Sequence, residues 1–265
     1  MTFDVPGTLA NWPRRGKIEF RNVTLRYRED LEPALKNLSF VIEGGEKMGI
    51  CGRTGSGKSS TVLALLAGVD PVLVDGQILI DGVDITTIST DILRSSISLV
   101  SQSPSLFHLT IRENLTVGFT YGSTPNDEVI WSVLERVGMR DAVAKLDGKL
   151  DAKLTTDGLE FSRGERQLLC IARVLLERRK IVILDEASSS MDMKTDARLR
   201  TVLQTHLQDC TCIAVAHRIS TIVDFDIVSV LENGRLVEHG PPRQLLQKRS
   251  SNFARLAKSQ GITSA

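Results

Sequence analysis

Long hydrophobic runs are missing from this 265-residue chain. No apolar run approaches the roughly 18 residues that a membrane span requires, and the first residues lack the charged and apolar regions of a signal peptide. Basic residues show no excess, because 33 lysines and arginines stand against 32 aspartates and glutamates. Without a long basic run, nucleic acid is not favoured as a partner. Any membrane involvement is therefore expected to come from a partner.

Cysteine is also scarce, with four residues, and none of them forms a CxxC pair: Cys51, Cys170, Cys210 and Cys212. All four lie inside apolar segments, so small buried thiols in a reducing compartment are the preferred interpretation. A metal site or a disulfide is the alternative. With 42% hydrophobic and 25% charged residues, the composition is that of an ordinary globular protein.

A glycine-rich stretch at residues 52–59 fits the pattern GxxxxGK[ST] and lies between a strand-like run at 47–51 and a helix-forming run at 60–67. In this context, glycines let backbone N–H groups approach a polyphosphate at a helix N-terminus. Lys58 is expected to reach the β- and γ-phosphates, and the Ser59 hydroxyl to hold Mg²⁺. A glycine-rich turn that fits by chance is the alternative. The predicted nucleotide-binding residues of the loop are Gly52, Arg53, Thr54, Gly55, Ser56, Gly57, Lys58, Ser59 and Ser60.

The first third of the chain is predicted to be rich in strands, after a linker or tail at residues 1–16. Residues 17–27 alternate apolar and polar side chains, which indicates a half-buried strand, and a second strand is expected at 34–42. Asp81-Gly82 suits the turn of a hairpin between 77–80 and 83–85. A short helix is expected at 89–96, followed by a strand at 97–101.

The remainder alternates helices and apolar strands. Helical stretches at 110–159, notably 127–138, indicate a helical subdomain inserted into an α/β body. The clearest helix is 162–177, where Ser162 and Glu165 fit a capping box. Apolar strands are predicted at 181–184 and 211–216, with a helix at 194–207 between them. A hairpin around Asn233-Gly234 is predicted next, then a helical region from 241 to about 258 and a tail at 259–265.

Polar side chains follow three predicted strands and so are expected at one edge of the sheet: Gln102, Asp185, Glu186 and His217. Phosphoryl transfer to water needs a metal, neutralised phosphates and an oriented water. Asp185 is the candidate Mg²⁺ ligand and Glu186 the candidate general base. Gln102 is expected to contact the γ-phosphate or the metal through its side-chain amide, and His217 to form a hydrogen bond with the γ-phosphate. Solvated polar residues at strand ends are the alternative for each.

Five motifs in order carry a family resemblance. GRTGSGKSS at 52–60, Gln102 after a strand, FSRGERQ at 161–167, ILDEASSSMD at 183–192 and AHR at 216–218 resemble the ATP-binding cassette (ABC) ATPases. The likeness covers residues 17–258. GKIEF at 16–20, NLTVG at 114–118 and RQLLCIAR at 166–173 look most like the second nucleotide-binding domain of C-subfamily, multidrug-resistance-associated exporters.

The resemblance implies an α/β fold: a P-loop NTPase core with a mostly parallel sheet, an antiparallel β subdomain and an inserted helical subdomain at about 103–165. It implies ATP and Mg²⁺ as ligands, a second such domain as partner in a head-to-tail dimer, and transmembrane domains that hold the chain at the cytoplasmic face of a membrane. Tyr27 would stack on adenine, and Asp192 would communicate across the dimer. From the residues alone, Tyr27 can equally pack in a strand, and Asp192 can cap a helix.

The chain departs from the family's usual Leu-Ser-Gly-Gly-Gln signature, because residues 161–165 are Phe161, Ser162, Arg163, Gly164 and Glu165. Arg163 is bulky where a small residue is usual, and Glu165 brings a negative charge toward a polyphosphate. We therefore hypothesise that the chain's own nucleotide site is competent while the signature that it offers to a partner is impaired. A soluble ABC ATPase of repair or translation and a regulatory ATP-binding module remain alternative functions.

Overall fold

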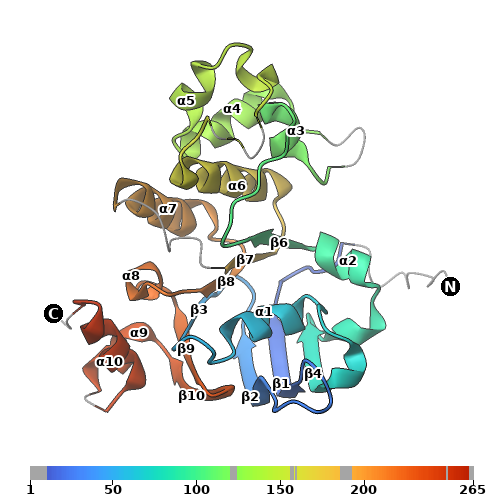
Figure 1. The fold of residues 1–265 in the computed structure, drawn as a ribbon, viewed down its shortest axis with the longest axis vertical. Coiled ribbons are helices and arrows are strands. Elements are labelled where there is room, and N and C mark those ends of the chain that lie inside the picture. The colour runs from blue at the N-terminus through green and yellow to red at the C-terminus, as the bar shows by residue number, and fades with distance from the viewer. Residues whose placement is uncertain are drawn as a thin grey trace. The chain divides into compact units, whose positions relative to one another are not determined.

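The computed structural model describes residues 11–119, 124–155, 158, 160–185, 193–248 and 250–262, without the side chains of 193 and 194 (Figure 1). The chain divides into two compact units. Unit 1 comprises residues 1–97, 180–186 and 209–265, and unit 2 comprises residues 98–179 and 187–208.

Unit 1 contains an antiparallel sheet of four strands in the order β2-β1-β4-β5. These strands are β1 (Ile18–Leu25), β2 (Leu35–Ile42), β4 (Val74–Ile80) and β5 (Val83–Asp84). Side chains alternate between buried and more exposed positions at both ends of β1, as its sequence predicts. Asp81 and Gly82 have φ angles of 50° and 80° in the turn between β4 and β5, which confirms the predicted hairpin.

The second sheet of unit 1 has the order β10-β9-β3-β8-β7 within this unit. Its strands are β3 (Lys47–Cys51), β7 (Ile181–Asp185), β8 (Thr211–Val215), β9 (Ile227–Glu232) and β10 (Arg235–Gly240). The first four run parallel, and β10 pairs antiparallel with β9. The continuous apolar sequences of β7 and β8 fit strands that are buried on both faces.

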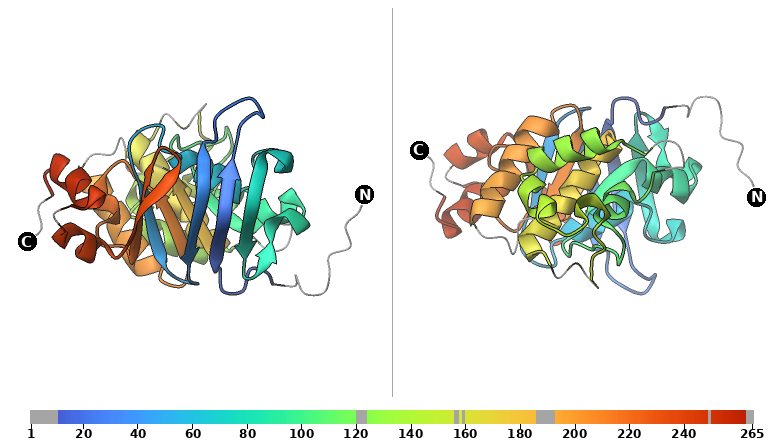
Figure 2. Two further views of the ribbon diagram at one scale, coloured as in Figure 1. Left: turned by 90° about the horizontal axis from the view of Figure 1, so that it is seen from below. Right: turned by 90° about the horizontal axis from the view of Figure 1, so that it is seen from above.

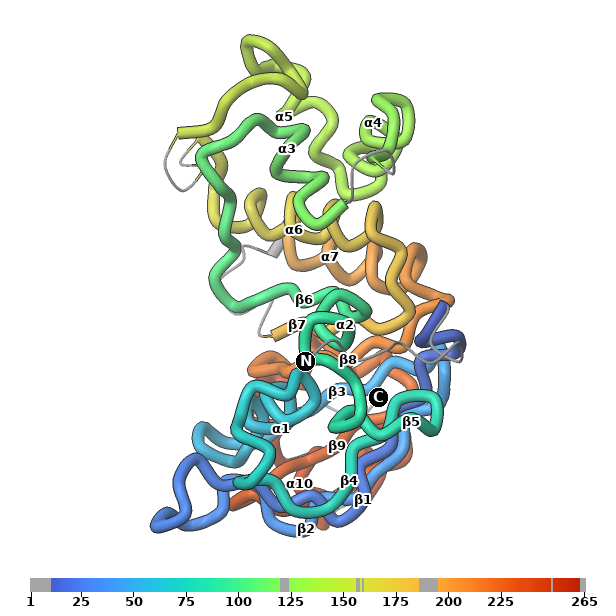
Figure 3. The backbone as a smooth tube through the Cα atoms, turned by 90° about the vertical axis from the view of Figure 1, so that its right-hand side faces the viewer, coloured from blue at the N-terminus to red at the C-terminus, as the bar shows by residue number. Residues whose placement is uncertain are grey.

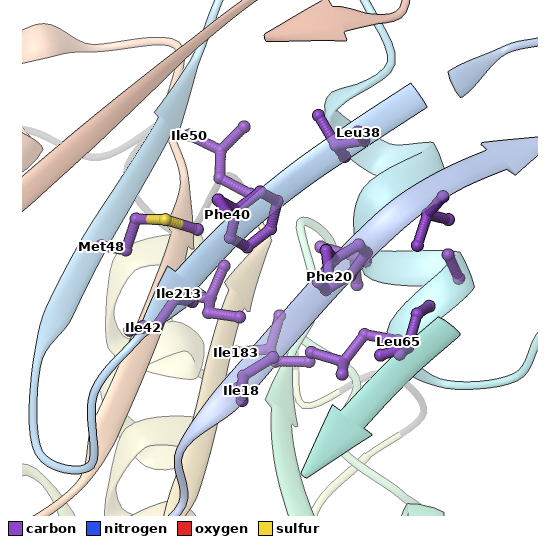
Figure 4. Packing of buried hydrophobic residues seen from close by; sticks show 14 of the residues in the cluster. Ile18, Phe20, Leu38, Phe40, Ile42, Met48, Ile50, Leu65, Ile183 and Ile213 are labelled. Carbon is purple, nitrogen blue, oxygen red and sulfur yellow. The ribbon is translucent and has the colours of Figure 1, made fainter. Parts of the chain in front are cut away.

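The core of unit 1 lies between its two sheets and helix α1 (Lys58–Leu65). Figure 4 shows Phe20 and Phe40 from the antiparallel sheet together with Ile183 and Ile213 from the parallel sheet and Leu65 from α1. The rings of Phe20 and Phe40 stack with centroids 4.5 Å apart. Burying a side chain of this size contributes about 1.5–3 kcal/mol, so this cluster fixes α1 against the sheets.

The other helices of unit 1 are α2 (Thr90–Ser95), α8 (Ile219–Ile222), α9 (Pro242–Gln247) and α10 (Asn252–Ser259), with 3₁₀ turns at Pro71–Leu73 and Ile85–Thr87. Figure 2 shows α9 and α10, in red, at the end of unit 1 where β9 and β10 lie. The sequence predicts α9 and α10 as one helical region, and Ser251 begins the second helix by accepting a hydrogen bond from the N–H of Ala254.

Unit 2 is mostly helical, although β6 (Ile97–Val100) starts at the last residue of unit 1. Its helices are α3 (Ile111–Thr116), α4 (Asp127–Arg136), α5 (Arg140–Ala144), α6 (Arg163–Glu177) and α7 (Met193–His206), with a 3₁₀ turn at Lys149–Asp151. Figure 3 shows α6 and α7 running beside each other. No helix in the described parts of either unit combines the length and hydrophobicity needed to cross a membrane.

Candidate nucleotide site

The loop between β3 and α1 requires glycine at two positions for steric reasons. Gly52 and Gly57 have φ angles of 148° and 104°, which residues other than glycine rarely adopt. A Cβ at residue 52 would lie 2.3 Å from the carbonyl oxygen of Leu231, and one at residue 57 would lie 2.9 Å from that of Ala34. The loop backbone therefore packs directly against strand β9 and against the residue that precedes β2.

Lys58 spans this loop from its carboxyl end. Its side chain is only 5% exposed, and its Nζ donates hydrogen bonds to the carbonyl oxygens of Gly52 and Arg53 at 3.0 and 3.1 Å. The carbonyl of Ser56 accepts from the N–H of Gly234 at 3.0 Å. Among the described residues, the buried hydroxyl of Ser56 has no hydrogen-bond partner. The loop is thus held in shape and carries a positive charge.

A cavity of about 340 Å³ opens in front of the loop. Its lining brings together the residue predicted to stack on a base, most of the loop and the residue after β8: Tyr27, Ala34, Thr54, Gly55, Gly57, Lys58, Ser59, Ser60 and His217. The N-terminus of α1 points its first N–H groups toward this side, and Gly57 at the N-cap offers no side chain to satisfy them. An anion such as a polyphosphate is the complementary ligand.

Tyr27 lies at the mouth of this cavity. Its hydroxyl is 2.8 Å from the hydroxyl of Ser60 in the first turn of α1, and the residue is 48% exposed. The hydroxyl is held by Ser60 while about half of the residue is exposed, so the aromatic ring offers a flat surface to a ligand. Gly52 and Arg53 line an adjoining cavity of about 350 Å³ instead.

Asp185 reaches the same edge of the sheet through strand pairing. It lies opposite Val215 of β8, and Val215 lies opposite Ile50 of β3, two residues before Gly52. Asp185 does not line the cavity in the described part of the chain. A carboxylate here and the hydroxyl of Ser59 supply hard oxygen donors, the type that Mg²⁺ prefers, so the residues present fit this ion.

The cysteines are free thiols, three of them buried and Cys210 partly exposed. Burial raises the pKa of Cys51, the last residue of β3, to about 12, and the charge of Lys58 offsets this only in part. The thiol beside the phosphate loop is therefore neutral and serves as a small apolar side chain. Glu186 and Asp192, also predicted as site residues, lie outside the described residues.

Unit 2 contains the signature segment, residues 161–165. The hydroxyl of Ser162 accepts from the N–H of Glu165 at 3.3 Å, and the carboxylate of Glu165 accepts from the N–H of Ser162 at 2.9 Å. This confirms the predicted capping box. Phe161 is buried, and a Cβ at Gly164 would lie 2.9 Å from Cγ2 of Thr195. Glu165 therefore has a structural role in starting α6.

Two side chains of α6 also hold the segment that contains Gln102. Arg163 donates to the carbonyl oxygen of Gln102 at 3.2 Å, and Gln167 donates to that of Ser101 at 3.3 Å. Gln167 is 2% exposed. Gln167 was not predicted as a site residue, although a glutamine one turn after Arg163, among the apolar residues of α6, is a usable signal.

Comparison with known proteins identifies the family of this chain. The sequence profile described as ABC transporter matches residues 35–189. The chain is 41% identical to ABC transporter C family member 14 of Dictyostelium discoideum over 255 residues, which are 96% of this chain and 19% of that protein. It is also 41% identical to ATP-binding cassette sub-family C member 2 of Rattus norvegicus over 253 residues, 96% of this chain and 16% of that protein.

A solved structure has the same fold. A bacterial Atm1-family ABC exporter with ATP bound aligns with a TM-score of 0.87 and 32% identity, over 98% of this chain and 45% of that one. The chain thus spans less than a fifth of the length of these two relatives and under half of that exporter chain. Because the family profile covers more than half of its residues, this chain belongs to the ABC transporter family.

Proposed function

We propose that this chain is a nucleotide-binding domain of an ABC exporter, which binds ATP with Mg²⁺ and hydrolyses it to ADP and phosphate. The observation that carries the proposal is the cavity in which Tyr27, Lys58 and His217 meet. It offers an aromatic surface for a base, an ammonium group and helix N–H groups for phosphates, and an imidazole for the terminal phosphate. The similarity to an exporter with ATP bound supports the same ligand.

Each residue has a defined task in this proposal. Lys58 and the N–H groups of residues 55–59 neutralise the phosphates, and Tyr27 stacks on adenine. Mg²⁺ would be held by Ser59 and Asp185, with Gln102 contributing to the metal or the γ-phosphate, and would offset the charge that develops during phosphoryl transfer. Glu186 aims the attacking water, and His217 bonds the γ-phosphate.

The partners follow from the family. We infer a second nucleotide-binding domain in a head-to-tail dimer, with Asp192 and residues 161–165 facing the partner's nucleotide, and transmembrane domains that hold the pair at the cytoplasmic face of a membrane. Exposed Phe107 and Leu109, which follow Gln102, are candidate contacts for those domains. The similarity to C-subfamily relatives supports this assignment.

The test is ATP turnover of the wild type and of Glu186→Gln. We expect the variant to bind Mg-ATP with unchanged affinity and to lose nearly all turnover, since a general base contributes about 10²–10⁴-fold. Equal turnover in both proteins would favour a regulatory ATP-binding module instead.

A further inference from the structure

We propose that Gln260 is a positioning residue that holds His217 at the edge of the nucleotide cavity. This inference rests on the proposed function, since it assigns Gln260 an effect on the ATP-hydrolysing step. Gln260 belongs to a stretch that the sequence predicts to be a tail. The structure instead connects it directly to the strand end that carries His217.

The side-chain amide of Gln260 bonds the backbone on both sides of Arg218. Its Nε2 donates to the carbonyl oxygen of His217 at 2.8 Å, and its Oε1 accepts from the N–H of Ile219 at 2.8 Å. Ile219 is the first residue of α8, so this bond satisfies one of the N–H groups that a helix start leaves open. One planar amide thereby fixes the backbone from residue 217 to residue 219.

Gln260 is itself fixed at the C-cap of α10. Gly261 follows in a left-handed conformation with φ of 76°. The N–H of Ile262 bonds the carbonyl of Ala257 at 3.0 Å, and that of Gly261 bonds the carbonyl of Lys258 at 3.1 Å. These two bonds form a Schellman motif, which fixes the end of the helix and the direction in which Gln260 leaves it.

The other end of α10 is attached to β10 of the second sheet. The carboxylate of Glu238 on β10 accepts hydrogen bonds from the hydroxyl of Ser251 and from the N–H groups of Asn252 and Phe253. Phe253 and Ala257 are fully buried. Because α10 is held at both ends and along one face, Gln260 acts from a rigid support.

The backbone near His217 has room to move if this support is lost. The cavity of about 350 Å³ beside the phosphate loop is lined by Thr54, His217 and Gln260 among others, and it adjoins the nucleotide cavity at Thr54 and His217. Without the amide, the segment after β8 can relax into this space. A shift of His217 by about 1 Å is enough to lower a catalytic rate by up to about 100-fold.

The experiment measures kcat and ATP affinity of a fused dimer that pairs this chain with its partner domain, with Gln260→Met or Gln260→Glu introduced in this chain. Gln260→Met has a similar length and removes both hydrogen bonds, whereas Gln260→Glu keeps the acceptor for Ile219 and removes the donor to His217. We expect both to lower kcat roughly 10-fold to 100-fold, with thermal unfolding near that of the wild type and, for Gln260→Met, an ATP Kd within about twofold. Gln247→Met, at an exposed site on α9, is the matched control and keeps wild-type kcat.

A double-variant cycle separates positioning from simple helix capping. In the His217→Ala background, Gln260→Met is expected to cause no further loss of kcat, because its effect passes through His217. Wild-type kcat in Gln260→Glu, or an equal further loss in the His217→Ala background, would overturn the role of Gln260. A wild-type fused dimer without any turnover contradicts the proposed function itself. Turnover that all Gln260 variants retain contradicts this inference alone.

Discussion

The hydroxyl of Tyr27 lies 2.8 Å from the hydroxyl of Ser60. This hydrogen bond joins the segment after β1, in the antiparallel sheet, to the first turn of α1, which begins at the phosphate loop. Together with the core packing that fixes α1 against both sheets, this contact sets the distance between the ring of Tyr27 and the loop before α1. The two ends of a nucleotide, its base and its phosphates, require a fixed separation of this kind.

The first prediction concerns the ring of Tyr27. Tyr27→Ala should weaken ATP binding by about 1–3 kcal/mol, roughly fivefold to 150-fold in Kd, because base stacking is lost. Inorganic triphosphate should bind both proteins equally, since it has no base. Tyr27→Phe keeps the ring and is the control for loss of the bond to Ser60. Equal ATP affinity of the wild type and Tyr27→Ala, measured by calorimetry, would rule out stacking on this residue.

The second prediction concerns Asp81, which anchors residues 14–17 to the hairpin. The N–H groups of residues 14–16 donate to its Oδ2 at 2.7, 2.9 and 3.2 Å, and that of Lys17 donates to Oδ1 at 2.8 Å. Burial alone would raise the pKa of Asp81, but the hydrogen bonds from the backbone of residues 14–17 outweigh it, and the pKa is lowered. Asp81→Asn should therefore lower the free energy of unfolding by about 1–3 kcal/mol at neutral pH.

The pH dependence of this loss follows from the lowered pKa. A carboxylate whose pKa is lower in the folded state stabilises the fold fully above its unfolded pKa, about 3.9, and loses this contribution as pH falls through the folded value. Urea unfolding should show a constant difference between wild type and Asp81→Asn above about pH 5 and a shrinking one below about pH 4. Asp75→Asn, with a side chain 75% exposed, is the control. A difference that grows on acidification would contradict the assignment.

The third prediction concerns the signature. The carboxylate of Glu165 accepts a hydrogen bond in the capping box, and Arg163 donates one to the carbonyl of Gln102. Glu165 differs in charge, and Arg163 in size and charge, from the residues usual in the family at these positions. In a fused dimer that pairs this chain with its partner domain, Arg163→Gly with Glu165→Gln should raise turnover and shorten nucleotide retention at the composite site. Glu165→Gln alone preserves the cap and tests the charge separately. Unchanged turnover and retention at both sites would count against an impaired signature.

Local signals in the sequence predict much of this structure. The hairpins at Asp81-Gly82 and Asn233-Gly234 follow from turn chemistry, because both residues of each turn adopt positive φ. The capping box of α6 follows from the three-residue spacing of Ser162 and Glu165. The parallel strands β7 and β8 follow from their continuous apolar sequences. Most residues of the cavity follow from the glycine-rich motif and from the position of His217 after a strand, whereas Tyr27 was assigned only through the family resemblance and Ala34 was not predicted.

Contacts that depend on distant parts of the chain were not predictable in this way. Gln260 meets His217 across 43 positions in the sequence, and a glutamine after a polar helix end carries no local sign of such a partner. The anchoring of residues 14–17 by Asp81 spans more than 60 positions. In both cases a polar side chain satisfies backbone groups, and the need for it appears only once the fold has brought those groups together.

The most direct test of the account is calorimetric titration of Mg-ATP into the wild type and Lys58→Ala, with Lys248→Ala, at an exposed site, as the matched control. Lys58 is buried in the loop, and losing its charged hydrogen bonds to the phosphates should cost about 1.5–3 kcal/mol, roughly tenfold to 150-fold in Kd. We expect this loss in Lys58→Ala and wild-type affinity in Lys248→Ala, with all three proteins folded. ATP affinity in Lys58→Ala equal to that of the wild type would contradict it.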